Sequence, residues 1–254
     1  MFVHYRTQGI ILKKIDRGET DQLLTIYTKD FGKLEILAKA IRKITSKLRQ
    51  GAEIFYLSEV EFIQGRTYKT LTDAILIEKF KNLRHNLKKL SIVYKISEVL
   101  DQMVKGQEPD EKIWHFLNEI FTKLNNCQLS PKDPPPNFGG GPTGQAIVKC
   151  QMLYYYFLWN LFSFLGYQPE LYQCSFCQKK LVPEKLYFSP KEGGIICQNC
   201  SSKIKFKSEI SPEVVKILRI ILKRNWPILK KLKIDSRTEK SLKEISNFYF
   251  SCIQ

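Results

Sequence analysis

Two Cys-x-x-Cys pairs limit the fold more than any other feature of this sequence. They are Cys174/Cys177 and Cys197/Cys200, and nineteen residues separate the two pairs. This spacing is typical of four thiolates that surround one Zn²⁺ ion in a tetrahedral site. Four protein ligands leave no open position for a substrate, so we expect structural zinc, one ion per chain. The alternative interpretation is a set of four unligated thiols.

The N-terminal residues contain no secretory signal, because no long apolar core with a cleavage site follows the first charges. We therefore expect a reducing, cytoplasmic compartment. Residues 150–169 carry no charged side chain and are numerous enough to cross a membrane. Gln151, Asn160 and Ser163 interrupt this stretch, so we expect a buried core helix, with a membrane span as the alternative.

The net charge predicts the chemistry of a partner. The chain has 41 Lys and Arg residues against 25 Asp and Glu residues, which gives +16. Such an excess predicts nucleic acid, an anionic membrane surface or an acidic peptide as the partner. Half of the excess falls on residues 201–254, which hold 13 basic and 5 acidic side chains. Spread along amphipathic helices, these cations form either a solvated face or a binding face.

The first 80 residues show the period-two alternation of β-strands. We expect five strands, and their predicted ranges are 3–14, 22–29, 33–39, 53–63 and 68–78. Five short antiparallel strands favour a small barrel or a sandwich, and the OB-fold is the common five-stranded barrel. The predicted fold class is therefore α+β, with a β-barrel at residues 1–80.

From residue 79 the apolar residues recur at helical spacing, which predicts an α-helical domain over 81–254. Asp110 opens one predicted helix, and Ser211-Pro212-Glu213 has the signature of another helix start. The uncharged stretch predicts a helix at about 147–165, and the last helix is expected at about 237–251. The prolines and glycines of 131–145 predict a flexible surface loop, and the four cysteines lie in a module at 172–202.

A cationic segment lies between the third and fourth predicted strands. It contains five basic residues and no acidic one: Lys39, Arg42, Lys43, Lys47 and Arg49. A cationic loop beside a β-sheet is suited to follow a phosphate backbone, so these residues are the candidate nucleic-acid-binding set. The alternative is a loop that is only solvated.

No catalytic motif is present in the sequence. The three histidines, His4, His85 and His115, do not form the His-x-Glu motif that a zinc deaminase needs. Walker A, G-x-G-x-x-G, H-E-x-x-H and G-x-S-x-G motifs are also missing. We therefore expect a protein that is not an enzyme, and an enzyme of unrecognised type is the alternative.

Three blocks of the sequence contain distinctive motifs. These blocks are TQGIILKKIDRGETDQLLTIYTKDFGKLEILAKAIRK (7–43), FSFLGYQPELYQCSFC (162–177) and YFSPKEGGIICQNC (187–200). The first contains a Gly-Glu-x-Asp turn at Gly18–Asp21. The second contains Leu-Gly-x-x-Pro-x-Leu, and the third has Phe-Ser-Pro-x-x-Gly-Gly before a cysteine pair. Together the three blocks resemble the bacterial RecO family of DNA repair and recombination mediators.

The resemblance implies an N-terminal OB-fold and a helical domain that bears the zinc module. It also implies a mediator of the RecF pathway that binds and anneals single- and double-stranded DNA. Such a protein helps to load recombinase onto strands coated by single-strand DNA-binding protein. The implied partners are RecR and the C-terminal tail of single-strand DNA-binding protein, and the implied location is the cytoplasmic nucleoid, away from membranes. An RNA-binding zinc-ribbon protein of the ribosome or transcription machinery is the alternative.

Overall fold

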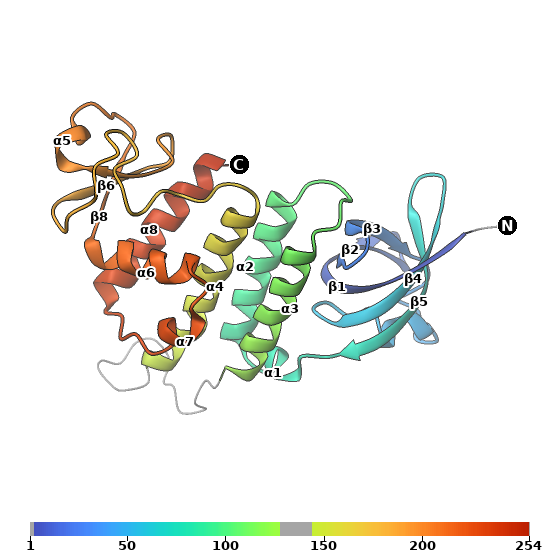
Figure 1. The fold of residues 1–254 in the computed structure, drawn as a ribbon. Helices are drawn as coiled ribbons and strands as arrows, with labels where there is room; N and C mark the ends of the chain where they lie inside the picture. Colours follow the sequence, from blue (N-terminus) through green and yellow to red (C-terminus); the bar gives the residue numbers. More distant parts are fainter. Residues whose placement is uncertain (1–2, 128–143, 254) are drawn as a thin grey trace. The chain divides into compact units, whose positions relative to one another are not determined.

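A computed structural model describes residues 3–127 and 144–253 (Figure 1). The chain divides into two compact units, Met1–Cys127 and Gln128–Gln254, which we call the N-terminal unit and the C-terminal unit. Strands dominate the first unit and helices the second, which confirms the α+β prediction. The predicted helical domain at 81–254 stays a prediction, because the compact N-terminal unit also includes the three helices that follow the strands.

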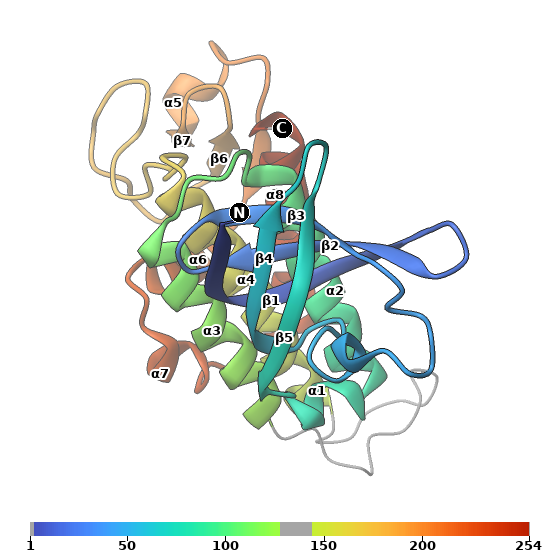
Figure 2. The same cartoon turned by 90° about the vertical axis from the view of Figure 1, so that its right-hand side faces the viewer.

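Five strands form a closed barrel in the N-terminal unit. They are β1 (His4–Arg17), β2 (Asp21–Thr28), β3 (Gly32–Ala38), β4 (Leu57–Gln64) and β5 (Lys69–Glu78). Their order around the barrel is β1-β2-β3-β5-β4, and β4 pairs with β1 to close it. All neighbouring strands are antiparallel except β3 and β5, which are parallel (Figure 2). The predicted five-stranded OB-fold is therefore confirmed.

Alternation along each strand fills the barrel with apolar side chains. On β3, Leu34 and Ile36 are buried while Glu35 between them is exposed, because successive side chains point to opposite faces. The main barrel core consists of Ile11, Leu24, Ile26, Leu34, Ile36, Ala38, Ile41, Ala52, Val60, Phe62, Leu71 and Ala74. The hydrophobic pattern alone thus assigns most of the inward positions correctly.

The predicted strand at 53–63 begins too early, because β4 starts only at Leu57. Phe55 has a φ of 63°, a left-handed conformation that a strand does not contain. Its side chain is nevertheless buried, and its N–H donates to the Ile11 carbonyl oxygen at 2.7 Å. Residues 53–56 are therefore a loop anchored on β1.

Three helices follow the barrel in the same unit: α1 (Lys81–Arg84), α2 (Leu87–Met103) and α3 (Glu111–Asn126). Asn86 and Asp110 cap α2 and α3, because each side chain accepts hydrogen bonds from two backbone N–H groups of the first turn. The ring of Phe121 on α3 contacts Phe55 and Phe80, with centroid distances of 6.2 and 5.4 Å. These aromatic contacts join α3 to the loops at one end of the barrel.

The C-terminal unit is built around four helices: α4 (Gly144–Phe164), α6 (Pro212–Leu222), α7 (Trp226–Leu229) and α8 (Ser236–Ile253). Ser211 caps α6 as predicted, since its Oγ accepts from the N–H of Val214 at 3.3 Å. Trp159 on α4 is fully buried and stacks on Tyr249 of α8 at 5.2 Å. The stretch predicted as a core helix at 147–165 is therefore helical, and its Trp159 side chain lies in the core.

Within the described ranges, no helix combines the length and apolarity needed to cross a membrane. The predicted loop at 131–145 falls outside the described residues except for its last two positions, which begin α4.

Candidate metal centre and nucleic-acid interface

The four cysteines converge on a small sheet of the C-terminal unit. Strands β6 (Leu186–Ser189), β7 (Gly194–Cys197) and β8 (Ser208–Ile210) pair in the order β7-β6-β8, and the short helix α5 (Gln198–Ser201) follows β7. We call residues 172–210 the cysteine module (Figure 1). Cys197 ends β7 and Cys200 lies in α5, while Cys174 and Cys177 come from the segment before β6. The module therefore brings together both pairs predicted from spacing.

The four sulfur atoms lie within 4.8 Å of one another, a group that could hold a metal ion. The Sγ atoms of Cys177 and Cys197 are 3.9 Å apart. Ile196 and Ile204 pack against the cysteines and are buried, so the cluster has an apolar lining. Four thiol ligands with no histidine or carboxylate among them are typical of structural sites.

Backbone N–H groups point at the Cys174 sulfur. Burial opposes ionisation of this thiol, but the backbone amides of Cys177, Cys197 and Phe176 outweigh burial and lower the pKa of Cys174 to about 7. The Cys197 N–H lies 3.4 Å from this sulfur. A thiolate is the form that binds metal, so the peptide groups prepare Cys174 as a ligand.

Two glycines dock the first cysteine pair onto the second. Gly193 has a φ of 70°, and its carbonyl accepts from the Glu170 N–H at 2.8 Å. A Cβ on Gly194 would lie 2.3 Å from the Glu170 carbonyl oxygen, so only glycine allows this approach. Ser175 then donates its N–H to the Ile195 carbonyl oxygen at 2.8 Å. The Gly-Gly sequence before Cys197 thus has a geometric function.

The structure divides the predicted DNA-binding residues into two groups, and all five are exposed. Lys39, Arg42 and Lys43 lie beside carboxylates near the β1–β2 turn. Arg42 forms an ion pair with Asp16 at 3.3 Å. Asp21 accepts from the Ala40 N–H at 2.7 Å, and this bond, helped by Thr20 and the charges of Lys39 and Lys43, lowers the pKa of Asp21. Carboxylates therefore offset part of the charge of this first group.

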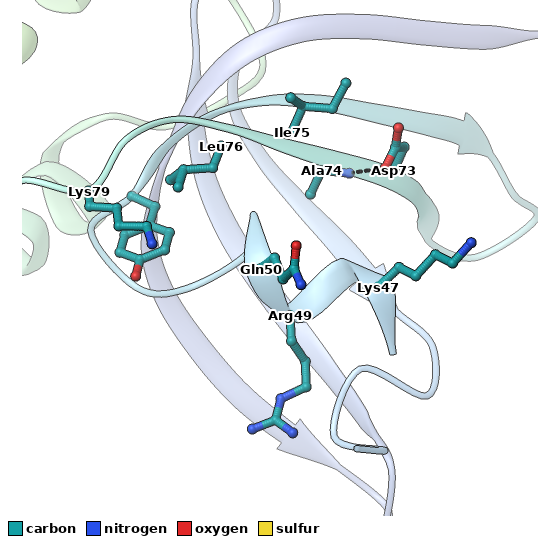
Figure 3. Close-up of a pocket in the computed structure, with 9 residues that line it drawn as sticks. Lys47, Arg49, Gln50, Asp73, Ala74, Ile75, Leu76 and Lys79 are labelled. Carbon is teal, nitrogen blue, oxygen red and sulfur yellow. Dashed lines mark hydrogen bonds between the residues drawn. The ribbon is translucent and has the colours of Figure 1, made fainter. Parts of the chain in front are cut away.

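Lys47 and Arg49 form the second group and line a groove of about 910 Å³ (Figure 3). The groove lies between the 3-10 helix η1 (Lys47–Gln50) and strand β5. Lys79 lies at the end opposite Lys47, and Gln50 lies between them, while Arg49 points away from β5 (Figure 3). Lys79 was not among the predicted residues, since it follows the last strand and lies outside the cationic segment between the third and fourth predicted strands.

One aromatic ring and one carboxylate also line this groove. The aromatic residue is Tyr56, and the guanidinium of Arg84 lies over its ring, 4.3 Å from the ring centroid. Asp73 is the acidic lining residue, and its carboxylate accepts from the Ala74 N–H at 2.8 Å. The groove is thus lined by three cations, one acid and one aromatic ring, a composition that suits a polyanion with stacking groups.

Comparison with known proteins matches both ends of the chain to one family. Residues 1–80 match the family model described as the N terminal of recombination protein O, and residues 145–252 match the C terminal of the same protein. A protein of Dehalococcoides mccartyi named DNA repair protein RecO is 31% identical over 91% of this chain and 83% of its own length. A protein of the same name from a Thermoanaerobacter species is 27% identical over 96% of this chain and 90% of its own. The chain therefore belongs to the RecO family of DNA repair proteins.

Proposed function

We propose that this chain is a recombination mediator of the RecF pathway, which binds and anneals DNA strands and helps to load recombinase onto strands coated by single-strand DNA-binding protein. The observation that carries the proposal is an OB-fold barrel with a cationic groove in a chain of the RecO family. Annealing follows from charge neutralisation, because two polyanions repel less when both lie on one cationic surface.

Phosphates would be neutralised by Lys39, Arg42, Lys43, Lys47 and Arg49. Among these five, the geometry favours Lys47 and Arg49, which share the groove with Lys79 and have no ion-pair partner among the described residues. Tyr56 would offer an aromatic ring for base stacking in the same groove. Contacts of this kind follow the backbone and do not read the base sequence.

The metal is proposed to be one structural zinc ion held by Cys174, Cys177, Cys197 and Cys200. Zn–S bonds of about 2.3 Å place the sulfurs of a tetrahedral site about 3.8 Å apart, which fits the 3.9 Å between Cys177 and Cys197. Bound zinc would cross-link the two cysteine pairs and would thereby stabilise the folded state. The protein residues supply the thiolates and the apolar cover of Ile196 and Ile204.

The proposed partners are single- and double-stranded DNA, RecR and the C-terminal tail of single-strand DNA-binding protein. The net charge of +16 suits the DNA and the acidic tail alike. We also propose that the protein is not an enzyme and that it acts in the cytoplasm at the nucleoid.

The proposal is tested by annealing of complementary strands, bare and coated with the cognate single-strand DNA-binding protein. We expect the chain to accelerate annealing of both substrates. The Lys47→Gln/Arg49→Gln double variant should anneal more slowly than the parent, while its far-UV circular dichroism stays unchanged. A parent chain that leaves the annealing rate of both substrates unchanged would refute the mediator function.

A further inference from the structure

A second surface, on the C-terminal unit, combines exposed aromatic rings with cations. Six basic side chains lie over aromatic rings between Tyr172 and Phe206: Lys185, Lys191, Lys203, Lys207, Arg219 and Lys223. Tyr172, Phe176 and Phe206 are 47%, 46% and 41% exposed. A substantial part of each of these three aromatic residues is therefore open to solvent.

Tyr172 is the best-formed part of this surface. The Arg219 guanidinium lies 4.7 Å from the centroid of the Tyr172 ring, and the Lys223 ammonium lies 5.7 Å from it. Arg219 is held in place, because its Nε and Nη2 both donate to the Leu171 carbonyl oxygen, at 3.0 and 2.5 Å. Lys223 is the C-cap of α6 and follows Arg219 at the i+4 position. Both side chains therefore project to the same side at the C-terminal end of this helix.

A hollow of about 350 Å³ adjoins this ring. Its lining combines the ring, two cations, two amides and one apolar side chain, and it consists of Tyr172, Gln173, Gln178, Lys180, Leu181 and Arg219. In the part of the chain that the structure describes, neither Lys180, Arg219 nor Lys223 forms an ion pair with a carboxylate within 4.0 Å. The cations around Tyr172 therefore keep their charge available for an anion.

We infer that this hollow binds one nucleotide of a single-stranded nucleic acid, with a base stacked on Tyr172 and Arg219 and the adjoining phosphates on Lys180 and Lys223. Rings and guanidinium planes are the partners on which unpaired bases stack, and amides such as Gln173 and Gln178 can bond base edges. Five of the six lining residues carry a polar or charged group, so both base edges and phosphates would find hydrogen-bond partners in the hollow. This site lies outside the barrel groove and would give the chain a second contact with the strand.

The test uses the full chain with its metal content verified and a fluorescein-labelled oligothymidylate. Tyr172→Leu should weaken binding roughly tenfold, because it removes base–aromatic stacking. Tyr172→Phe keeps the ring and should bind within about twofold of the parent. Tyr167→Leu is the matched control, since Tyr167 is 44% exposed in the same unit.

The salt dependence separates stacking from charge. Tyr172→Leu should keep the parent's slope of log affinity against log salt, because stacking releases no counterions. Lys180→Gln/Lys223→Gln should flatten the slope by about 1.4, at roughly 0.7 for each phosphate that is no longer neutralised. Photocrosslinking with a 5-iodouracil oligonucleotide should place an adduct on Tyr172.

Affinity of Tyr172→Leu equal to that of the parent, without an adduct at Tyr172, would overturn this inference. If Tyr172→Leu binds DNA normally but no longer binds an acidic peptide, the hollow is a peptide site and the inference is also wrong. The barrel groove is judged separately by Lys47→Gln/Arg49→Gln, so either surface can fail without the other.

Discussion

The indole Nε1 of Trp159 donates a hydrogen bond of 2.9 Å to the Oγ of Ser246, and both side chains are buried. The Ser246 hydroxyl in turn donates to the Leu242 carbonyl oxygen at 2.7 Å. The Trp159 indole on α4 is therefore both hydrogen-bonded to α8 and packed against it, although 87 positions separate Trp159 from Ser246. A buried indole N–H without such a partner would cost stability.

Trp159→Ala should destabilise the C-terminal unit by roughly 3–5 kcal/mol, because it removes a buried aromatic side chain and leaves a cavity. Urea titration followed by far-UV circular dichroism measures this change. Trp226→Ala is the control, since Trp226 is only partly buried and should cost less. Equal destabilisation by the two variants would contradict a core position for Trp159.

Cys197→Ser should lower the zinc content from about one ion per chain and reduce resistance to urea, because a four-thiolate site loses one ligand. Elemental analysis of the purified protein measures the zinc. Cys252→Ser is a matched control, since Cys252 is exposed and lies outside the cluster. A parent protein that folds fully without metal would argue against structural zinc.

Gly194→Ala should loosen the cysteine module and lower its metal retention, because a Cβ would lie 2.3 Å from the Glu170 carbonyl oxygen. Gly193→Asn should be tolerated, since no atom lies within 4 Å of the added Cβ and asparagine accepts a positive φ. Competition with a chelator, followed by zinc release, compares the two variants. Faster release from Gly193→Asn than from Gly194→Ala would contradict the close approach.

Lys47→Gln/Arg49→Gln should flatten the salt dependence of DNA binding by about 1.4, because two phosphates are no longer neutralised, at roughly 0.7 each on a single strand. Arg42→Gln/Lys43→Gln should flatten it less, since Asp16 and Asp21 already offset those charges. Fluorescence anisotropy across a salt series gives both slopes. A larger change for the second pair would move the phosphate path toward the β1–β2 turn.

Glu61→Gln should make the barrel less sensitive to acid. Hydrogen bonds from Arg6, then His4 and Thr72, lower the pKa of Glu61 to about 2. A lowered folded-state pKa stabilises the protein above the ordinary value of 4.5, and this stability is lost as the pH falls toward 2. The variant should melt at a lower temperature at neutral pH, and its melting temperature should fall less on acidification.

Thermal unfolding between about pH 6 and about pH 3 checks this prediction. Glu35→Gln is the control, because Glu35 is exposed on β3 and its side chain has no hydrogen bond or ion pair within the described ranges. A melting temperature for Glu61→Gln that falls as steeply as that of the parent would refute the role of Glu61.

Short-range sequence patterns predicted the barrel and the cysteine cluster well. Both depend on spacing, since alternation sets the faces of β3 and two knuckles place four thiols at one point. The start of β4 was missed because the buried Phe55 adopts a left-handed conformation that alternation does not reveal. Local pattern is informative only where local geometry is regular.

The surfaces proposed to bind DNA could be predicted only in part. Arg42 meets Asp16, 26 positions earlier, and a charge count along the loop does not include that partner. Tyr172 and Arg219 are 47 positions apart, and neither stands out in its own segment. Such pairs are made by tertiary folding, so a single sequence without its fold does not reveal them.

Strand β5 is joined to β3 by only two residue pairs, Ile36 with Lys69 and Leu37 with Thr70. The chain between β3 and β4 lies against β5 further along that strand, where the backbone of Gly51 approaches Ala74. The seam between β3 and β5 therefore has the fewest paired residues of the five junctions around the barrel. A small widening of this seam would shift β3 relative to the start of β5, while the long antiparallel ladders keep their register.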